Sequence, residues 1–305
     1  MIARLILTAP IVWTLVGSQP WPAEAPEARR RQTFRAQVEG VSVTVAVHDG
    51  RRGVSGLTAD DFELTDNGVV QKITSVSVES TPIDLTLVLD TSSSMSGGML
   101  ERFIGDVHAV EGMLGEGDRA ALMTFSSSTR LAAPLRSPTL SPASSELAPA
   151  GSTAFYQALI AALLSPSTPG RPHLVLALSD GDDNISLLDG NDVRELARRS
   201  DTVLYVVLRG TLRASGSRVG WLAFRGPGDL AALKDAAAAT GGEVRQEKPD
   251  APVAGLFKRV LDDFKASYVL RYTPTGVAAG GWHELGVGVK KGRYAVRARR
   301  GYDGG

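Results

Sequence analysis

Between Ile83 and Ser267, short apolar runs alternate with longer segments whose apolar residues recur at helical spacing. The alternating segments read LTLVLD, MLERFIGDVHAVEGML, RAALMTF, TAFYQALIAALL, HLVLALSD, VRELARR, TVLYVVL, LAALKDAAAA and APVAGLFKRVLDDF. Parallel strands need a crossover connection, usually a helix, and these helices cover both faces of the sheet. The pattern therefore predicts a doubly wound, Rossmann-like α/β fold over residues 81–266, with a mainly parallel central sheet.

The two flanks of this core, residues 37–80 and 267–303, show the period-2 alternation of half-buried strands instead. In the first flank, Asn67-Gly68 predicts a hairpin turn, and Thr58 with Asp61 predicts a capped single helical turn. In the second, Lys291-Gly292 marks a turn. The second flank is too short to fold alone, so we expect both flanks to form one discontinuous β module.

The first residues have the features of a secretory signal. Arg4 precedes an apolar stretch from Leu5 to Val16, and small residues follow up to Ala23-x-Ala25. The stretch is shorter than the roughly 20 residues that a membrane-spanning helix needs. We therefore expect a signal peptide at 1–25, a polar linker at 26–36, and a secreted or periplasmic protein with no membrane span after signal removal.

Charge and cysteine content exclude several functions. The 305 residues contain 33 Lys plus Arg and 33 Asp plus Glu, so no net field favours nucleic acid as a partner. Cysteine is absent, so any metal site must use oxygen or imidazole ligands.

Polar oxygen donors gather where three segments should meet. Asp90-Thr91-Ser92-Ser93-Ser94 ends one predicted strand, Ser179-Asp180-Gly181 ends another, and Ser152-Thr153 precedes a helix. The carboxyl ends of parallel strands share one edge of an α/β sheet, where ligands bind. Mg²⁺ prefers oxygen ligands and needs one or two carboxylates. We therefore expect Asp90 and Asp180 to supply charge, and Ser92, Ser94 and Thr153 to supply neutral oxygens.

These residues resemble the metal-ion-dependent adhesion site (MIDAS) of von Willebrand factor type A (VWA) domains. The resemblance rests on Asp90-x-Ser92-x-Ser94, Gly-x-Thr ending at Thr153, and Ser-Asp-Gly around Asp180, and it covers roughly residues 80–265. It implies that Ser92, Ser94 and Thr153 coordinate Mg²⁺, or Mn²⁺ or Ca²⁺ in its place. Asp90 and Asp180 would bind the ion directly or through water. An exposed Asp or Glu of a protein partner would complete the shell.

The flanks GLTADDFELTDNGVVQKI, SYVLRYTP and RARRGY are similar to those of a bacterial subgroup of VWA proteins known mainly from acidobacterial genomes. Family members can switch affinity by moving the last helix, here residues 251–265.

Two other functional classes stay open at this point. Asp90 could be a phosphoryl acceptor of haloacid-dehalogenase type, with Asp182 and Asp183 helping to bind Mg²⁺. However, Ser92 stands where that family has its second aspartate, and Asp182 and Asp183 are typical of a solvated turn. A purely structural envelope protein is the other alternative. No G-x-S-x-G motif is present, and the four histidines lie outside the serine-rich loop, so we expect no enzyme.

A second candidate contact surface lies in residues 209–227. This segment follows the predicted strand 202–208, so we expect it to begin at the carboxyl ends of the strands, near the predicted metal site. Arginine and tryptophan are enriched at binding hot spots. We therefore consider Arg209, Arg225 and, in particular, Arg213, Arg218, Trp221 and Phe224 as candidate partner-binding residues.

Overall fold

The computed structural model describes residues 40–50, 52–77, 82–136, 140, 147–166, 168, 171–209, 227–248, 251 and 254–304. The predicted signal peptide and the predicted linker therefore lie outside the described residues. By its contacts the chain divides into two units, Met1–Gln37 and Val38–Gly305. All described residues belong to the second unit.

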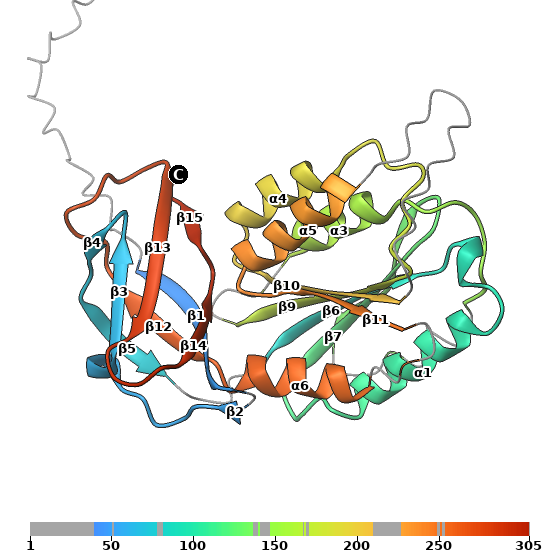
Figure 1. The fold of residues 1–305 in the computed structure, drawn as a ribbon. Helices are drawn as coiled ribbons and strands as arrows, with labels where there is room; N and C mark the ends of the chain where they lie inside the picture. The colour runs from blue at the N-terminus through green and yellow to red at the C-terminus, as the bar shows by residue number, and fades with distance from the viewer. Residues whose placement is uncertain are drawn as a thin grey trace, which may run out of the picture. The chain divides into compact units, whose positions relative to one another are not determined.

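A central sheet with helices on both faces confirms the predicted doubly wound α/β fold (Figure 1). Its strands lie in the order β11-β10-β9-β6-β7-β8. All pair in parallel except β8, which is antiparallel to β7. The strands are β6 (Asp84–Asp90), β7 (Arg119–Phe125), β8 (Thr129–Arg136), β9 (His173–Ser179), β10 (Val203–Arg209) and β11 (Val244–Glu247).

The helices form two layers, one on each face of this sheet (Figure 1). One layer comprises α1 (Met99–Glu111) and α6 (Ala254–Lys265), and the other comprises α3 (Phe155–Leu163), α4 (Gly190–Arg199) and α5 (Pro227–Ala239). Strand β6 is buried along its whole length. Leu87 packs in the core beneath α1 and α6, whereas Val88 packs in the core beneath α3, α4 and α5. Alternate residues of a strand point to opposite faces, so a strand covered on both sides is apolar throughout.

Strand β8 is not evident from the apolar pattern of the sequence. It is an edge strand that is mostly half-buried or exposed, and it contains Pro134. Proline is tolerated at a sheet edge because it does not have to donate a ladder hydrogen bond there. The segment therefore has little of the hydrophobic signature by which the other strands are recognised.

Strands from the two flanks pair with one another. Strand β1 (Val41–Asp49) pairs antiparallel with β12 (Tyr268–Tyr272) and with β14 (Ala295–Ala298). Strand β3 (Phe62–Asp66) pairs with β13 (Trp282–Val289). The remaining elements are β2 (Arg52–Gly53), η1 (Ala59–Asp61), β4 (Val69–Val70), β5 (Ile73–Ser77) and β15 (Gly301–Asp303). The boundaries assigned above to the separate domains stay a prediction.

Two local predictions in the first flank are confirmed. Thr58 and Asp61 form a capping box around η1. Asn67 and Gly68, with φ of 47° and 78°, connect β3 to β4. Positive φ at both positions is what a type I′ hairpin turn requires. In the described part of the chain, no helix is long and apolar enough to cross a membrane.

Candidate metal centre

The predicted site residues follow the carboxyl ends of β6 and β9, which are neighbours in the sheet. Asp90 is the last residue of β6, and Ser179 is the last residue of β9, directly before Asp180. Because β6 and β9 run in parallel, both turns emerge at the same edge. In a doubly wound fold this edge is where the connections diverge and ligands bind.

Asp90, Ser92 and Ser94 are joined by hydrogen bonds. The buried carboxylate of Asp90 accepts from the Ser92 Oγ at 2.6 Å and from the Ser92 backbone N–H at 2.9 Å, both through Oδ1. The hydroxyls of Ser92 and Ser94 lie 3.0 Å apart. Ser92 is buried, and Ser94 is exposed. The short helix η2 (Ser93–Met95) turns the chain here and places two hydroxyls on the same side of the turn as the carboxylate.

Asp180 is half-buried and close enough to Asp90 for the two charges to interact. Burial raises the pKa of Asp90 to about 6, hydrogen bonds from Ser92 and Ser179 oppose the shift, and the Asp180 charge adds to it. Asp90 forms no ion pair with a lysine, arginine or histidine of the described residues. Asp180 forms no such ion pair within the described ranges either, so among these residues the two neighbouring carboxylates have no cationic partner.

The segment that carries Thr153 is bonded to both other turns. Gly151 accepts a hydrogen bond from the backbone N–H of Ser93 at 2.9 Å. Asn184, in the turn after β9, forms hydrogen bonds with both the backbone N–H and the backbone carbonyl oxygen of Thr153. Thr153 is buried, and its hydroxyl forms no hydrogen bond to the other predicted ligands among the described residues. The structure therefore brings the three segments together through their backbones, and it joins Asp90, Ser92 and Ser94 through their side chains as well.

Asp183, predicted to belong to a solvated turn, has a structural role. Its carboxylate accepts from the backbone N–H of Tyr156 at 2.9 Å and from that of Ser186 at 3.0 Å. Tyr156 lies in the first turn of α3, where backbone N–H groups have no partner within the helix. Asp183 therefore fixes the start of α3, the helix that directly follows Thr153.

The donor set consists of two carboxylates and three hydroxyls. No group of three or more His, Cys, Asp or Glu that could hold a metal occurs among the described residues. The five predicted residues would form a different class of site, because most of their donors are neutral. Such hard oxygen donors fit Mg²⁺, which commonly needs only one or two carboxylates. A dication would also compensate the two carboxylates, since buried charges are normally paired or bound to metal.

The prediction that Arg209 contacts a partner is wrong, because the side chain is buried. It is only 2% exposed. Its guanidinium forms an ion pair of 2.8 Å with Asp106 of α1 and donates to the Ala251 carbonyl oxygen at 2.9 Å. It also lies over the ring of Phe103. Arg209 therefore connects β10 to α1 and to the segment before α6. The other candidate partner residues lie outside the described residues: Arg213, Arg218, Trp221, Phe224 and Arg225.

Fold and geometry together define a doubly wound α/β domain with an oxygen-rich loop cluster at the carboxyl edge of its sheet. A family model described as von Willebrand factor type A domain matches residues 84–212. The chain thus carries a VWA domain over these residues. VWA domains commonly mediate protein–protein interaction and are mostly not enzymes.

Solved structures with similar folds have low sequence identity to this chain. A von Willebrand factor type A protein from Catenulispora acidiphila has 12% identity and a TM-score of 0.49, over 88% of this chain and 74% of its own. Proximal thread matrix protein 1 from the mussel byssus has 16% identity and a TM-score of 0.49, over 65% and 50%. An aerotolerance-related membrane protein from Bacteroides fragilis has 14% identity and a TM-score of 0.46, over 60% and 98%. No curated protein matches the sequence. These similarities do not bear on function.

Proposed function

We propose that this protein is a metal-dependent protein-binding module without catalytic activity. Asp90, Ser92, Ser94, Thr153 and Asp180 would hold Mg²⁺, or Mn²⁺ or Ca²⁺ in its place, and the ion would capture an exposed Asp or Glu of a partner protein. The observation that carries the proposal is the buried carboxylate of Asp90. It is bonded to a serine of its own turn and to a serine of the neighbouring strand, and it lies close to Asp180.

Charge balance supports an acidic partner. Two carboxylates neutralise a dication, and the three hydroxyls add no further negative charge. A bound cation would supply an electrophilic centre that still attracts an outside carboxylate. The chain's own residues hold the donors in place and keep Asp90 out of bulk water, which strengthens electrostatic interactions at the site.

We also propose that the protein acts outside the cytoplasm, in a secreted or periplasmic location. The support is the sequence alone: the charged, apolar and small-residue segments up to Ala25 have the order of a secretory signal. Metal-dependent capture of a partner at this location would not require a membrane span in the domain itself.

Calorimetric titration of the purified chain with Mg²⁺ and with Mn²⁺ tests the metal centre. We expect one ion to bind the wild type, and we expect Asp180→Ala to abolish binding because one of the two charges is lost. Ser94→Ala should weaken binding. Ser93→Ala is the matched control, because Ser93 lies in the same turn but is not a predicted ligand. Unchanged binding in Asp180→Ala would contradict the assignment.

The partner class is tested by pull-down from an envelope fraction in Mg²⁺ and in a chelator. A captured protein supports the proposal only if replacing one of its Asp or Glu residues by Asn or Gln removes the Mg²⁺-dependent binding. Capture that persists in chelator would contradict the proposal. Incubation with a small phosphodonor should leave Asp90 unphosphorylated, whereas a covalent phosphoaspartate would favour the enzyme alternative.

A further inference from the structure

Two polar residues of the turn after β9 connect this turn to the rest of the candidate metal centre. They are Ser179, at the end of β9, and Asn184, five residues further along the chain. Neither is a predicted ligand. A polar residue at the end of a buried strand, directly before Asp180, is the sequence signal that points to Ser179.

The hydrogen-bond directions at Ser179 are determined by its chemistry. Its Oγ lies 2.7 Å from Oδ2 of Asp90 and 3.0 Å from the backbone N of Gly181. The ionised carboxylate can only accept and the N–H can only donate, so the single hydroxyl proton of Ser179 points to Asp90. Ser179 is completely buried. Both oxygens of Asp90 therefore have protein donors, because Oδ1 already accepts two bonds from Ser92.

The same argument orients the serine pair. Ser92 gives its only hydroxyl proton to Asp90, so in the 3.0 Å contact between the two serines Ser94 is the donor. The hydrogen bond to Asp90 therefore sets the orientation of both hydroxyls, and the hydrogen bond from Ser179 sets the orientation of the Asp90 carboxylate. A substitution at Ser179 should thus also change the orientation of the Ser92 and Ser94 hydroxyls.

Asn184 acts on Thr153 in a parallel way. Its side-chain Oδ1 accepts from the backbone N–H of Thr153 at 2.9 Å, and its own backbone N–H donates to the Thr153 carbonyl oxygen at 3.0 Å. The side chain of Asn184 is exposed. Two reciprocal bonds thus tie the backbone of a buried predicted ligand to the turn that carries Asp180.

We propose that Ser179 and Asn184 are positioning residues of the metal centre. Ser179 orients the Asp90 carboxylate, and Asn184 fixes the backbone of Thr153, so that donors from three separate segments converge on one cation. This inference rests on the proposed function, because it presupposes a cation at these donors. Residues that orient metal ligands typically change metal affinity by about 10- to 100-fold when they are replaced.

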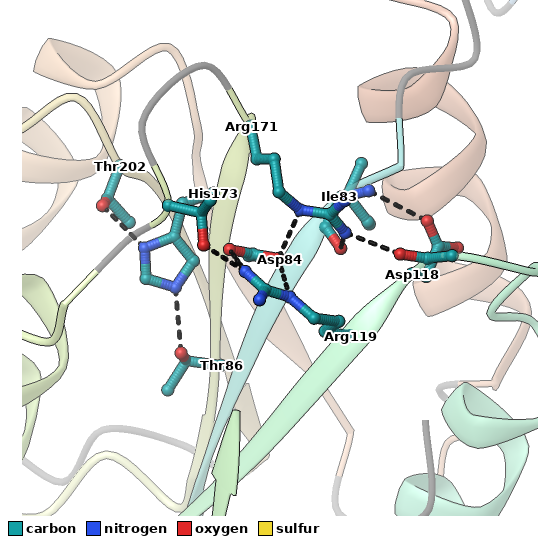
Figure 2. Close-up of polar contacts among 10 residues, drawn as sticks. Ile83, Asp84, Thr86, Asp118, Arg119, Arg171, His173 and Thr202 are labelled. Carbon is teal, nitrogen blue, oxygen red and sulfur yellow. Dashed lines mark hydrogen bonds and ion pairs between the residues drawn. The ribbon is translucent and has the colours of Figure 1, made fainter. Parts of the chain in front are cut away.

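The first test compares Ser179→Ala with Ser179→Thr by Mn²⁺ titration and by thermal unfolding without metal. We expect Ser179→Ala to weaken Mn²⁺ binding by about 10-fold or more. Ser179→Thr retains a hydroxyl and should recover affinity. The matched control is Thr86→Val, which removes another buried hydroxyl on the neighbouring strand β6, near its amino end, where Thr86 contacts His173 (Figure 2). It should lower thermal stability and leave Mn²⁺ affinity unchanged.

The second test uses Asn184→Ala, because an exposed side chain can be replaced with little risk to folding. We expect about 10-fold weaker Mn²⁺ binding, whereas Asn191→Ala, an exposed asparagine in the first turn of α4, should bind like wild type. If the wild type binds Mn²⁺ and both Ser179→Ala and Asn184→Ala bind equally well, the positioning role is overturned and the proposed function stands. If the wild type binds no cation, both are overturned.

Discussion

Asp84 is a single residue that joins three neighbouring strands at their amino ends, opposite the candidate metal centre. Its buried carboxylate accepts from Arg119, the first residue of β7, through Nε at 2.9 Å and Nη2 at 2.6 Å. It also accepts from Nε of Arg171, just before β9, at 2.8 Å. Figure 2 shows both guanidinium groups around this carboxylate. One side chain thus pairs with two cations, and this arrangement compensates for its burial.

Asp84→Asn should therefore destabilise the protein. The two arginines would lose their charge partner, although their partial exposure lets water replace some of the interaction. We expect a loss of roughly 2 kcal/mol in the free energy of unfolding, measured by urea denaturation. Asp262→Asn is the control, because the exposed pair of Asp262 with Lys258 should contribute less than about 0.5 kcal/mol. Equal stability of the two variants would contradict the role of Asp84.

The same residue predicts a pH dependence. Burial disfavours the charged form of Asp84, but hydrogen bonds from Arg119 and Arg171 outweigh it and hold the pKa below the ordinary 3.8. A carboxyl whose pKa is depressed by folding contributes stability above its unfolded pKa and loses it as the pH falls through its folded pKa. The stability difference between wild type and Asp84→Asn should thus be constant near neutral pH and shrink below about pH 4. Urea denaturation at each pH measures this difference.

Among the helices, α4 has the clearest capping interactions. The Asp189 carboxylate accepts from the backbone N–H of Asn191 at 2.8 Å and of Asp192 at 3.3 Å. In return, Asp192 accepts from the Asp189 backbone N–H at 2.7 Å. This capping box also fixes the end of the turn that begins at Ser179. The start of α4 is therefore determined by local sequence.

Replacing Asp189 by Ala should lower the free energy of unfolding by about 1 kcal/mol, because two N–H groups at the helix start lose their acceptor. Circular dichroism during urea denaturation measures the change. Asp235→Ala, an exposed aspartate inside α5, removes the same charge from a helix interior and should have an effect within about 0.5 kcal/mol. An equal effect in both variants would show that charge, not capping, is responsible.

Across the whole described unit, contacts connect the flank strands to the helices and strands of the α/β core. His48 of β1 pairs with Asp263 of α6 at 3.1 Å. Arg299 contacts Asp201 at the start of β10, and Arg300 donates its backbone N–H to Ala239 of α5 at 2.9 Å. Beside the last contact, a Cβ on Gly241 would lie 3.2 Å from the Ala298 backbone. The turn after α5 therefore packs closely on the second flank.

Two glycines with the same φ of +86° allow a test of this packing. In Gly281→Ala the new Cβ would have open space around it. This substitution should therefore lower the free energy of unfolding by only roughly 1 kcal/mol, because alanine disfavours the positive φ. In Gly241→Ala the new Cβ would also press against the backbone of Ala298. This substitution should therefore lower the free energy of unfolding by at least about 1 kcal/mol more than Gly281→Ala. Urea denaturation gives both values, and hydrogen exchange at the Arg300 amide should accelerate only in Gly241→Ala. Equal losses would show that the contact is not tight.

Much of the fold and of the candidate site could be predicted because the signals are local. Continuous apolar runs such as LTLVLD mark strands buried on both faces, and Asp90 and Asp180 directly follow such runs. The two edge strands β8 and β11 and the burial of Arg209 could not be predicted, since they depend on neighbours distant in the chain. Arg209 has the composition of a surface residue and is buried because Asp106 and the Ala251 carbonyl lie within reach.

The sequence by itself therefore determined the order and type of the buried core elements, but not the edge strands β8 and β11. It also placed the hard oxygen donors at strand ends, because hydrophobic periodicity and turn chemistry act within a few residues. Only the tertiary structure decided that Ser179 donates to Asp90 and that Asn184 holds Thr153. Their partners are 89 and 31 residues away in the chain. The parallel packing of β6 against β9 brings Ser179 to Asp90, and the packing of the segment before α3 against the turn after β9 brings Thr153 to Asn184.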